Sequence, residues 1–109
     1  MRWKIFAQIP LLLIATFFST LSLADPTWID VRSAFEHRLD SIDGDVRISH
    51  TEIVQEVSKR FPDKSTEIKL YCLSGGRAGK AMSALEQAGY NNISNAGGIS
   101  DARKQRGLQ

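Results

Sequence analysis

Cys72 is the residue of this chain best suited to covalent chemistry. It is the only cysteine among 109 residues, and it ends an extended run, 67–72, in which apolar and polar residues alternate. The segment 73–81 that follows contains three glycines and leads into a helical pattern. A strand that ends at a cysteine, turns through glycines and enters a helix points several backbone N–H groups and the positive helix end at one sulfur. Such a setting favours the reactive thiolate over the thiol.

The glycines after Cys72 allow the backbone to fold around an anion. Two adjacent glycines lack a Cβ atom, so they can adopt conformations in which consecutive N–H groups converge. An arginine adds a cation where the expected helix begins. With Cys72 as the catalytic residue, the predicted substrate-binding residues are Leu73, Ser74, Gly75, Gly76 and Arg77. From spacing alone a second interpretation stays open, in which Cys72 is a small apolar residue that ends a core strand.

The first residues of the chain have the pattern of a cleaved signal peptide. Residues 1–24 begin with two basic residues, continue with an apolar run and end in small residues at Ala24. We therefore expect cleavage after Ala24, export to the periplasm and one soluble domain over residues 25–109, with no membrane contact after cleavage. An uncleaved membrane anchor is the alternative, although the polar residues in the second half of the run favour cleavage.

Charge and cysteine content narrow the possible functions of residues 25–109. Once the two basic residues of the signal segment are removed, twelve basic and twelve acidic side chains remain, which is no electrostatic footprint for nucleic acid. His37 and His50 are not spaced with Cys72 as metal ligands are, so we expect no metal and no cofactor. A lone thiol in an exported protein is buried, paired with another chain or used in chemistry.

Short apolar runs alternate with helical patterns, which is typical of an α/β domain with a largely parallel sheet. We expect strands over 27–31, 46–48, 67–72 and 91–95. We expect helices over 33–39, 49–60, 77–88 and 102–106, the second of them opened by a capping box of Ser49 and Glu52. Cys72 then lies beyond the carboxyl end of a strand, where ligands bind in open α/β sheets. Asp30 and Arg32, at the end of the first strand, are expected to fix its exit by hydrogen bonds near the site.

Three stretches of the sequence match a known pattern. They are 28–32, which reads Trp-Ile-Asp-Val-Arg, 71–79 around the cysteine, and 95–98 with its two glycines. Through them the chain resembles the single-domain rhodanese family of thiosulfate sulfurtransferases, most closely its small exported members. The resemblance implies a rhodanese-like α/β fold with a small parallel sheet of about five strands flanked by helices. It also implies that Cys72 takes a sulfane sulfur from thiosulfate or a similar donor, holds it as a persulfide and passes it to cyanide or a thiol.

One departure from the family pattern bears on the donor. Leu73 follows the cysteine where a basic or polar residue is common, which leaves Arg77 as the nearest cation for anionic thiosulfate. Another sulfane compound, or a protein persulfide as partner, is therefore an alternative donor.

Two other classes of function use a similar scaffold. A cysteine-based phosphatase or an arsenate-reductase-like enzyme also attacks an oxyanion with a thiolate held in a strand-loop-helix device. Four residues separate Cys72 from Arg77, one fewer than the phosphatase pattern requires, and Tyr71 replaces the histidine that usually precedes the cysteine. A non-catalytic binding module on the rhodanese scaffold is the other class, and the presence of both Cys72 and Arg77 argues against it.

Overall fold

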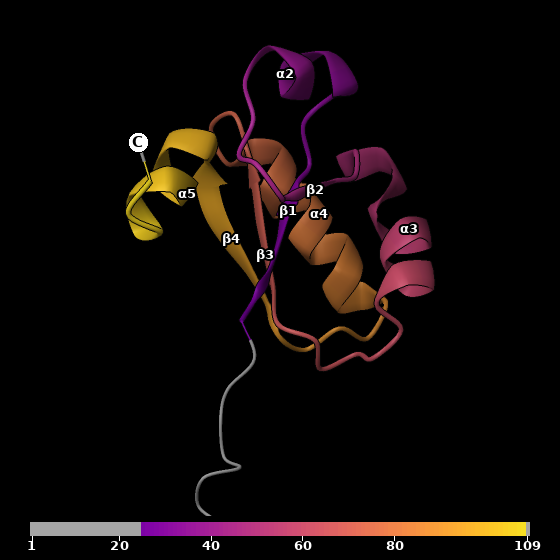
Figure 1. Ribbon diagram of the computed structural model, residues 1–109. Helices are drawn as coiled ribbons and strands as arrows, with labels where there is room; N and C mark the ends of the chain where they lie inside the picture. Colours follow the sequence, from indigo (N-terminus) through magenta and orange to yellow (C-terminus); the bar gives the residue numbers. More distant parts are fainter. Residues whose placement is uncertain (1–24, 109) are drawn as a thin grey trace, which may run out of the picture.

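The computed structural model describes residues 25–108, which form a parallel sheet with helices on both faces (Figure 1). The predicted signal peptide, residues 1–24, lies outside the described residues, as does the last residue of the predicted domain. Within the described part, no helix is both long enough and apolar enough to cross a membrane.

The sheet has four strands among residues 25–108. In chain order they are β1 Thr27–Asp30, β2 Val46–Arg47, β3 Ile68–Cys72 and β4 Ile93–Gly98. Their spatial order is β2-β1-β3-β4, and each neighbouring pair is parallel. The predicted α/β class and parallel sheet are confirmed. About five strands were expected and four are found, because no further segment of the described chain pairs its backbone with this sheet.

The helices form layers around the sheet. They are α2 Ala34–Leu39, the 3₁₀ turn η1 His50–Glu52, α3 Ile53–Arg60, α4 Gly76–Gln87 and α5 Ile99–Gln105. In Figure 1, α3 and α4 cover one face, α5 covers the other, and α2 lies above the carboxyl ends of the strands. The loop from β3 to α4 opens at that same end of the sheet.

Alternating residues of β3 divide the core into two parts. Ile68, Leu70 and Cys72 belong to the part beneath α3 and α4, as the period of two predicts, whereas Tyr71 belongs to the part beneath α5. The first part is the larger and also contains Ile29, Val31, Ile48, Ile53, Val57, Ala78, Ala81, Leu85 and Tyr90. Packing on both faces thus fixes the strand that carries the cysteine.

The start of the third helix differs from the prediction. The Ser49 hydroxyl accepts a hydrogen bond from the N–H of Thr51 at 3.3 Å and opens η1, so that α3 begins only at Ile53. A capping box forms instead at α2, where the side chains of Ser33 and Glu36 accept from each other's backbone N–H groups. The same spacing of serine and glutamate occurs at both places, but only at Ser33 does the backbone enter an α-helix directly.

The last strand is longer than predicted. Gly97 and Gly98, which lie beyond the strand expected over 91–95, pair with Tyr71 and Cys72 of β3, and α5 begins at Ile99 rather than at residue 102. A register shift opposite Leu70 and Tyr71 inserts one extra residue, which is a β-bulge. The bulge brings both glycines beside the cysteine.

Candidate active site

Cys72 lies at the end of β3 beneath the loop that enters α4. Cys72 is 1 % exposed, and the N–H of Gly75 donates a hydrogen bond to Cys72 Sγ at 2.9 Å. The N–H groups of Ala78, Ser74 and Arg77 also interact with this sulfur. Burial acts to raise the pKa of the Cys72 thiol, but the backbone hydrogen bonds outweigh it and hold the pKa below its ordinary value. The arrangement can therefore stabilise a thiolate or another anion at this position.

The predicted substrate-binding residues lie in this loop and in the first turn of α4. Leu73 is 60 % exposed and Ser74 is also exposed, so the two form the outer rim above the shielded thiol. Gly75 precedes the helix in a left-handed conformation with φ of 104°, and Gly76 is the first helical residue. This conformation lets the Gly75 N–H turn back toward the sulfur, which a residue with a side chain would do at a cost.

The end of β4 supports the loop from behind. The Asn95 side-chain amide donates to the Gly75 carbonyl at 3.0 Å, while its oxygen accepts from the N–H of Gly97 at 2.8 Å. Gly97 has a φ of 94°, and a Cβ added to Gly98 would collide with the carbonyl oxygen of Leu73. Gly98 is thus required because the backbone of β4 and the backbone of the loop meet here with no room for a side chain, whereas a Cβ on Gly97 would collide with the Asp101 carboxylate.

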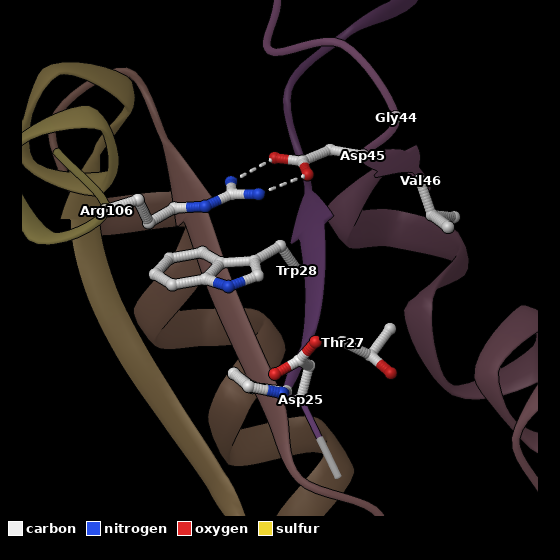
Figure 2. Close-up of a pocket in the computed structure, with 8 residues that line it drawn as sticks. Asp25, Thr27, Trp28, Gly44, Asp45, Val46 and Arg106 are labelled. Carbon is white, nitrogen blue, oxygen red and sulfur yellow. Dashed lines mark hydrogen bonds and ion pairs between the residues drawn. The ribbon is translucent and has the colours of Figure 1, made fainter. Parts of the chain in front are cut away.

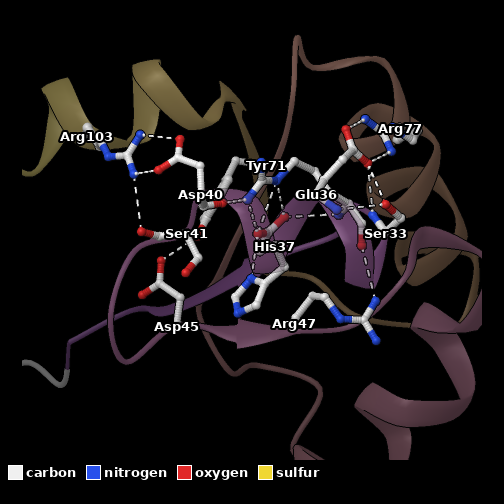
Figure 3. A network of polar contacts seen from close by, with 12 residues as sticks. Ser33, Glu36, His37, Asp40, Ser41, Asp45, Arg47, Tyr71, Arg77 and Arg103 are labelled. Atoms are coloured by element: carbon white, nitrogen blue, oxygen red, sulfur yellow. Dashed lines mark hydrogen bonds and ion pairs between the residues drawn. The ribbon is translucent and has the colours of Figure 1, made fainter.

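Arg77 does not stand alone at the start of α4. Its guanidinium donates to both carboxylate oxygens of Glu36, with Nη1 to Oε1 at 2.7 Å and Nη2 to Oε2 at 2.9 Å. Glu36 lies on α2, so the pair joins the helix above the strand ends to the helix behind the cysteine (Figure 3). The hydrogen bonds from Arg77 and the N–H of Ser33 lower the pKa of Glu36 to about 2. The role of Arg77 in substrate binding stays a prediction, and any such role involves Glu36.

Asp30 and Arg32 form a buried ion pair at the end of β1. Asp30 is 0 % and Arg32 is 3 % exposed, and the carboxylate accepts from the Arg32 backbone N–H, Nε and Nη2. His37 Nδ1 donates to the same carboxylate across 3.0 Å. Burial acts to raise the pKa of Asp30, but the bonds from Arg32 and His37 together lower it. The pair has the geometry expected of residues that fix the exit of the first strand. Its carboxylate also binds His37, a contact that no spacing in the sequence indicated.

A second polar cluster lies on the α5 side of the sheet. The Tyr71 hydroxyl donates to Asp45 at 2.7 Å, and Arg106 binds both oxygens of the same carboxylate. Figure 2 shows the Arg106 guanidinium above the ring of Trp28. The distance from Arg106 Cζ to the centre of the ring is 4.3 Å. A cavity of about 480 Å³ lies beside this stack and is lined by residues 25–28, 44–46 and 106, not by Cys72. This cluster fastens α5 to the turn before β2.

Three supporting residues were missed by sequence reasoning. Glu36 binds Arg77, Asn95 binds the loop carbonyl, and Asp101 accepts from the N–H of Gly98 at 2.9 Å. Glu36 and Asn95 act across elements that are distant in sequence, which a pattern of neighbours cannot reveal. Glu36 and Asp101 also carried a local signal, since each stands three residues after the residue that precedes its helix, Ser33 and Gly98.

Comparison with known families identifies the fold. A model of the rhodanese-like domain matches residues 19–105. The chain belongs to the rhodanese-like family. The match covers the strand that carries Cys72, the loop after it and the supporting glycines of β4, so the resemblance predicted from the sequence is confirmed.

Individual relatives agree with this assignment. The chain is 34 % identical over 91 residues to the thiosulfate sulfurtransferase PspE of Escherichia coli strain K12, which covers 84 % of this chain and 88 % of that protein. It is similar to a solved rhodanese with anions from E. coli, with a TM-score of 0.67 and 32 % identity over 71 % of this chain and 91 % of that one. It is also similar to the Rhodanese_3-like domain of the Alr3790 protein from Anabaena, with a TM-score of 0.68 and 26 % identity over 78 % and 97 % of the two chains. Together they support sulfurtransferase activity, the predicted enzyme class.

The described residues offer no cluster for a metal. Among residues 25–108, no group of three or more His, Cys, Asp or Glu side chains is placed to hold an ion.

Proposed function

We propose that this protein is a periplasmic sulfurtransferase that moves a sulfane sulfur from thiosulfate or a similar donor to cyanide or a thiol through a persulfide on Cys72. The observation that carries the proposal is the convergence of loop N–H groups on Sγ, with Gly75 at 2.9 Å. The lowered pKa of Cys72 is consistent with a thiolate as the attacking species.

The first step forms the persulfide. The Cys72 thiolate attacks the outer, sulfane sulfur of thiosulfate, and a new S–S bond forms. The bond between that sulfur and the sulfonate sulfur breaks, and sulfite leaves with the electron pair. The product is a cysteine persulfide anion, and its terminal charge can be held by the N–H groups that face the sulfur, those of Ser74, Gly75, Arg77 and Ala78.

The second step returns the thiolate. Cyanide or a thiolate acceptor attacks the outer sulfur of the persulfide, and the S–S bond to Cys72 breaks with its electron pair on Sγ. Cyanide leaves as thiocyanate, while a thiol acceptor leaves as a persulfide. No electron is gained or lost over the two steps, so the cycle needs no metal or redox cofactor.

The Glu36–Arg77 pair favours sulfur transfer over phosphate chemistry. A thiolate that attacks a phosphoryl group requires charge and hydrogen-bond donors at several oxygens at once. Here both terminal nitrogens of Arg77 donate to Glu36. The loop between Cys72 and Arg77 is also one residue shorter than the phosphatase pattern. A single added sulfur therefore fits the N–H groups of this loop better than a tetrahedral oxyanion.

The mechanism is tested by the mass of the intact mature protein. Thiosulfate is expected to add the mass of one sulfur atom, and cyanide is expected to remove it. The Cys72→Ser variant is the control, because it keeps the shape of the site and lacks the thiol. A Cys72→Ser protein that still transferred sulfur would contradict the mechanism, and strong Cys72-dependent hydrolysis of aryl phosphates without any persulfide would favour the phosphatase alternative.

The periplasmic location is tested separately. We expect osmotic shock to release a soluble protein that begins at Asp25, because the segment before it has the pattern of a signal peptide. Sequencing of its amino terminus checks the cleavage site. An intact Met1 in a washed membrane fraction would contradict export as a soluble species.

A further inference from the structure

The loop that holds Cys72 has a cation whose charge is balanced by another helix. Arg77 is the only cationic side chain between residues 72 and 79. Its guanidinium interacts electrostatically with Cys72 and Asp30 as well as Glu36, and the hydrogen bonds to Glu36 are the largest cause of its raised pKa. An anionic donor at the thiol therefore meets a guanidinium that already has a carboxylate partner.

Glu36 is held in this position by its own helix. Its Oε1 accepts from the backbone N–H and the hydroxyl of Ser33, both at 3.0 Å, and from Nη1 of Arg77 at 2.7 Å. With a pKa of about 2, the carboxylate is ionised throughout the pH range in which a thiolate works. The opposite charge at Glu36 is thus a permanent part of the site.

We propose that Glu36 is a specificity-determining residue, which balances the charge of Arg77 and shifts the preference of the site from dianionic donors such as thiosulfate toward sulfane donors of lower negative charge. The proposal rests on the sulfurtransferase function proposed above and deepens it. Glu36 touches no reacting atom. It acts on the donor through Arg77 and through its own charge.

The charge of the pair predicts an order among four proteins. Glu36 and Arg77 together carry no net charge in the natural chain and in the doubly substituted Glu36→Gln, Arg77→Ala chain. Glu36→Gln leaves one positive charge, that of the Arg77 guanidinium. Arg77→Ala leaves one negative charge, that of the Glu36 carboxylate. If charge decides donor preference, the dianion is most favoured by Glu36→Gln and least favoured by Arg77→Ala, with the natural and doubly substituted chains between them.

The test compares two donors that deliver the same sulfur from the same kind of head group. Thiosulfate is a dianion, and benzenethiosulfonate is a monoanion. For each protein, kcat/KM is measured with both donors and cyanide at low ionic strength, and the ratio of the two values is the readout. We expect Glu36→Gln to raise the ratio of thiosulfate to benzenethiosulfonate by about three- to tenfold, and Arg77→Ala to lower it by a similar factor.

The substitution at Glu36 is chosen to keep the fold. Glutamine at this position of a capping box still accepts from the backbone N–H of Ser33, so α2 keeps its first turn. Asp40→Asn is the matched control, since Asp40 follows the same helix and forms a similar two-bond pair with Arg103, away from the loop. It removes the same charge and is expected to leave the donor ratio unchanged.

The outcomes separate this proposal from the proposed function. A persulfide on Cys72 with both donors, together with an equal ratio in all four proteins, would overturn the role of Glu36 and leave sulfur transfer standing. The same holds if Glu36→Gln weakens both donors equally, because that is the result of a purely structural pair. A natural protein that forms no persulfide with either donor would overturn both. If Glu36→Gln does not fold, the comparison of Arg77→Ala with the doubly substituted chain decides, since the two differ only at Glu36 and equal ratios there contradict the proposal.

Discussion

Gly98 of β4 lies against the carbonyl oxygen of Leu73 so closely that a Cβ on Gly98 would collide with it. The two residues are 25 positions apart in the sequence, and they meet because β4 pairs with β3 as far as Cys72. The floor of the cysteine loop is thus the backbone of the neighbouring strand. The shape of the site depends on the absence of a side chain at this glycine.

Gly98→Ala is therefore expected to displace the loop. The added methyl group meets backbone, which cannot rotate away, so we expect a loss of about 1–3 kcal/mol in the free energy of unfolding. Sulfur transfer is expected to fall at least as steeply, because the N–H groups no longer converge on Sγ. Denaturant unfolding and the thiosulfate:cyanide assay measure the two effects. Gly76→Ala is the control, since a Cβ there has no neighbour within 4 Å; equal stability of the two variants would contradict the packing argument.

The thiol is expected to react at a lower pH in the folded protein than in the unfolded one. Burial opposes ionisation of Cys72, but the bonds from the loop N–H groups outweigh it and lower the pKa of the folded state. The thiolate therefore contributes stability above the pKa of the unfolded thiol, and that contribution is lost as the pH falls through the lower, folded pKa. The rate of alkylation by iodoacetamide against pH gives the two midpoints. A folded midpoint at or above the unfolded one would contradict the role of the loop.

Asp30→Ala is expected to destabilise the fold by about 3–5 kcal/mol, because it leaves the buried guanidinium of Arg32 without its partner. Asp40→Ala removes an exposed carboxylate that also binds an arginine, and it is expected to cost much less than Asp30→Ala, because water screens an exposed ion pair. Equilibrium unfolding in urea compares the two variants. Similar losses would mean that burial of the Asp30 pair does not matter.

The same carboxylate predicts a loss of stability in acid. Burial acts to raise the pKa of Asp30, yet the bonds from Arg32 and His37 lower it below its ordinary value. Its contribution is therefore fully present above the unfolded pKa and is lost as the pH falls through the folded one. Urea unfolding at a series of pH values is expected to show this fall in the natural chain and a weaker one in Asp30→Asn. Parallel curves for the two proteins would contradict the assignment.

Loop length is expected to decide between sulfur transfer and phosphate chemistry. A glycine inserted between Gly75 and Gly76 moves the first turn of α4 relative to Cys72. It thereby separates the backbone N–H groups that all interact with the Cys72 sulfur in the natural chain. We expect the insertion to reduce thiosulfate:cyanide activity and to increase, if anything, the affinity for phosphate or arsenate. Steady-state assays and competition by the two oxyanions measure both effects. An insertion that leaves sulfur transfer intact would show that the size of the loop is not decisive.

The local structure around Cys72 could be predicted from the order of the residues. The alternation at Ile68, Leu70 and Cys72 predicts which face of β3 packs against the helices, because side chains along a strand point to opposite faces in turn. The glycines after Cys72 predict a strand-to-helix turn, because a left-handed φ is readily adopted there only by glycine. These are local properties, so neighbours in the sequence suffice to determine them.

The tertiary structure decided which distant residues complete the site. Glu36 and Arg77 are 41 positions apart, and their contact exists only because α2 folds over the carboxyl ends of the strands. The strand character of Gly97 and Gly98 likewise depends on hydrogen-bonding partners that β3 supplies. Sequence spacing specifies what a segment can form by itself, whereas pairing and ion-pair partners depend on which segments packing brings together. The charge around Cys72 therefore follows from the fold, not from the loop alone.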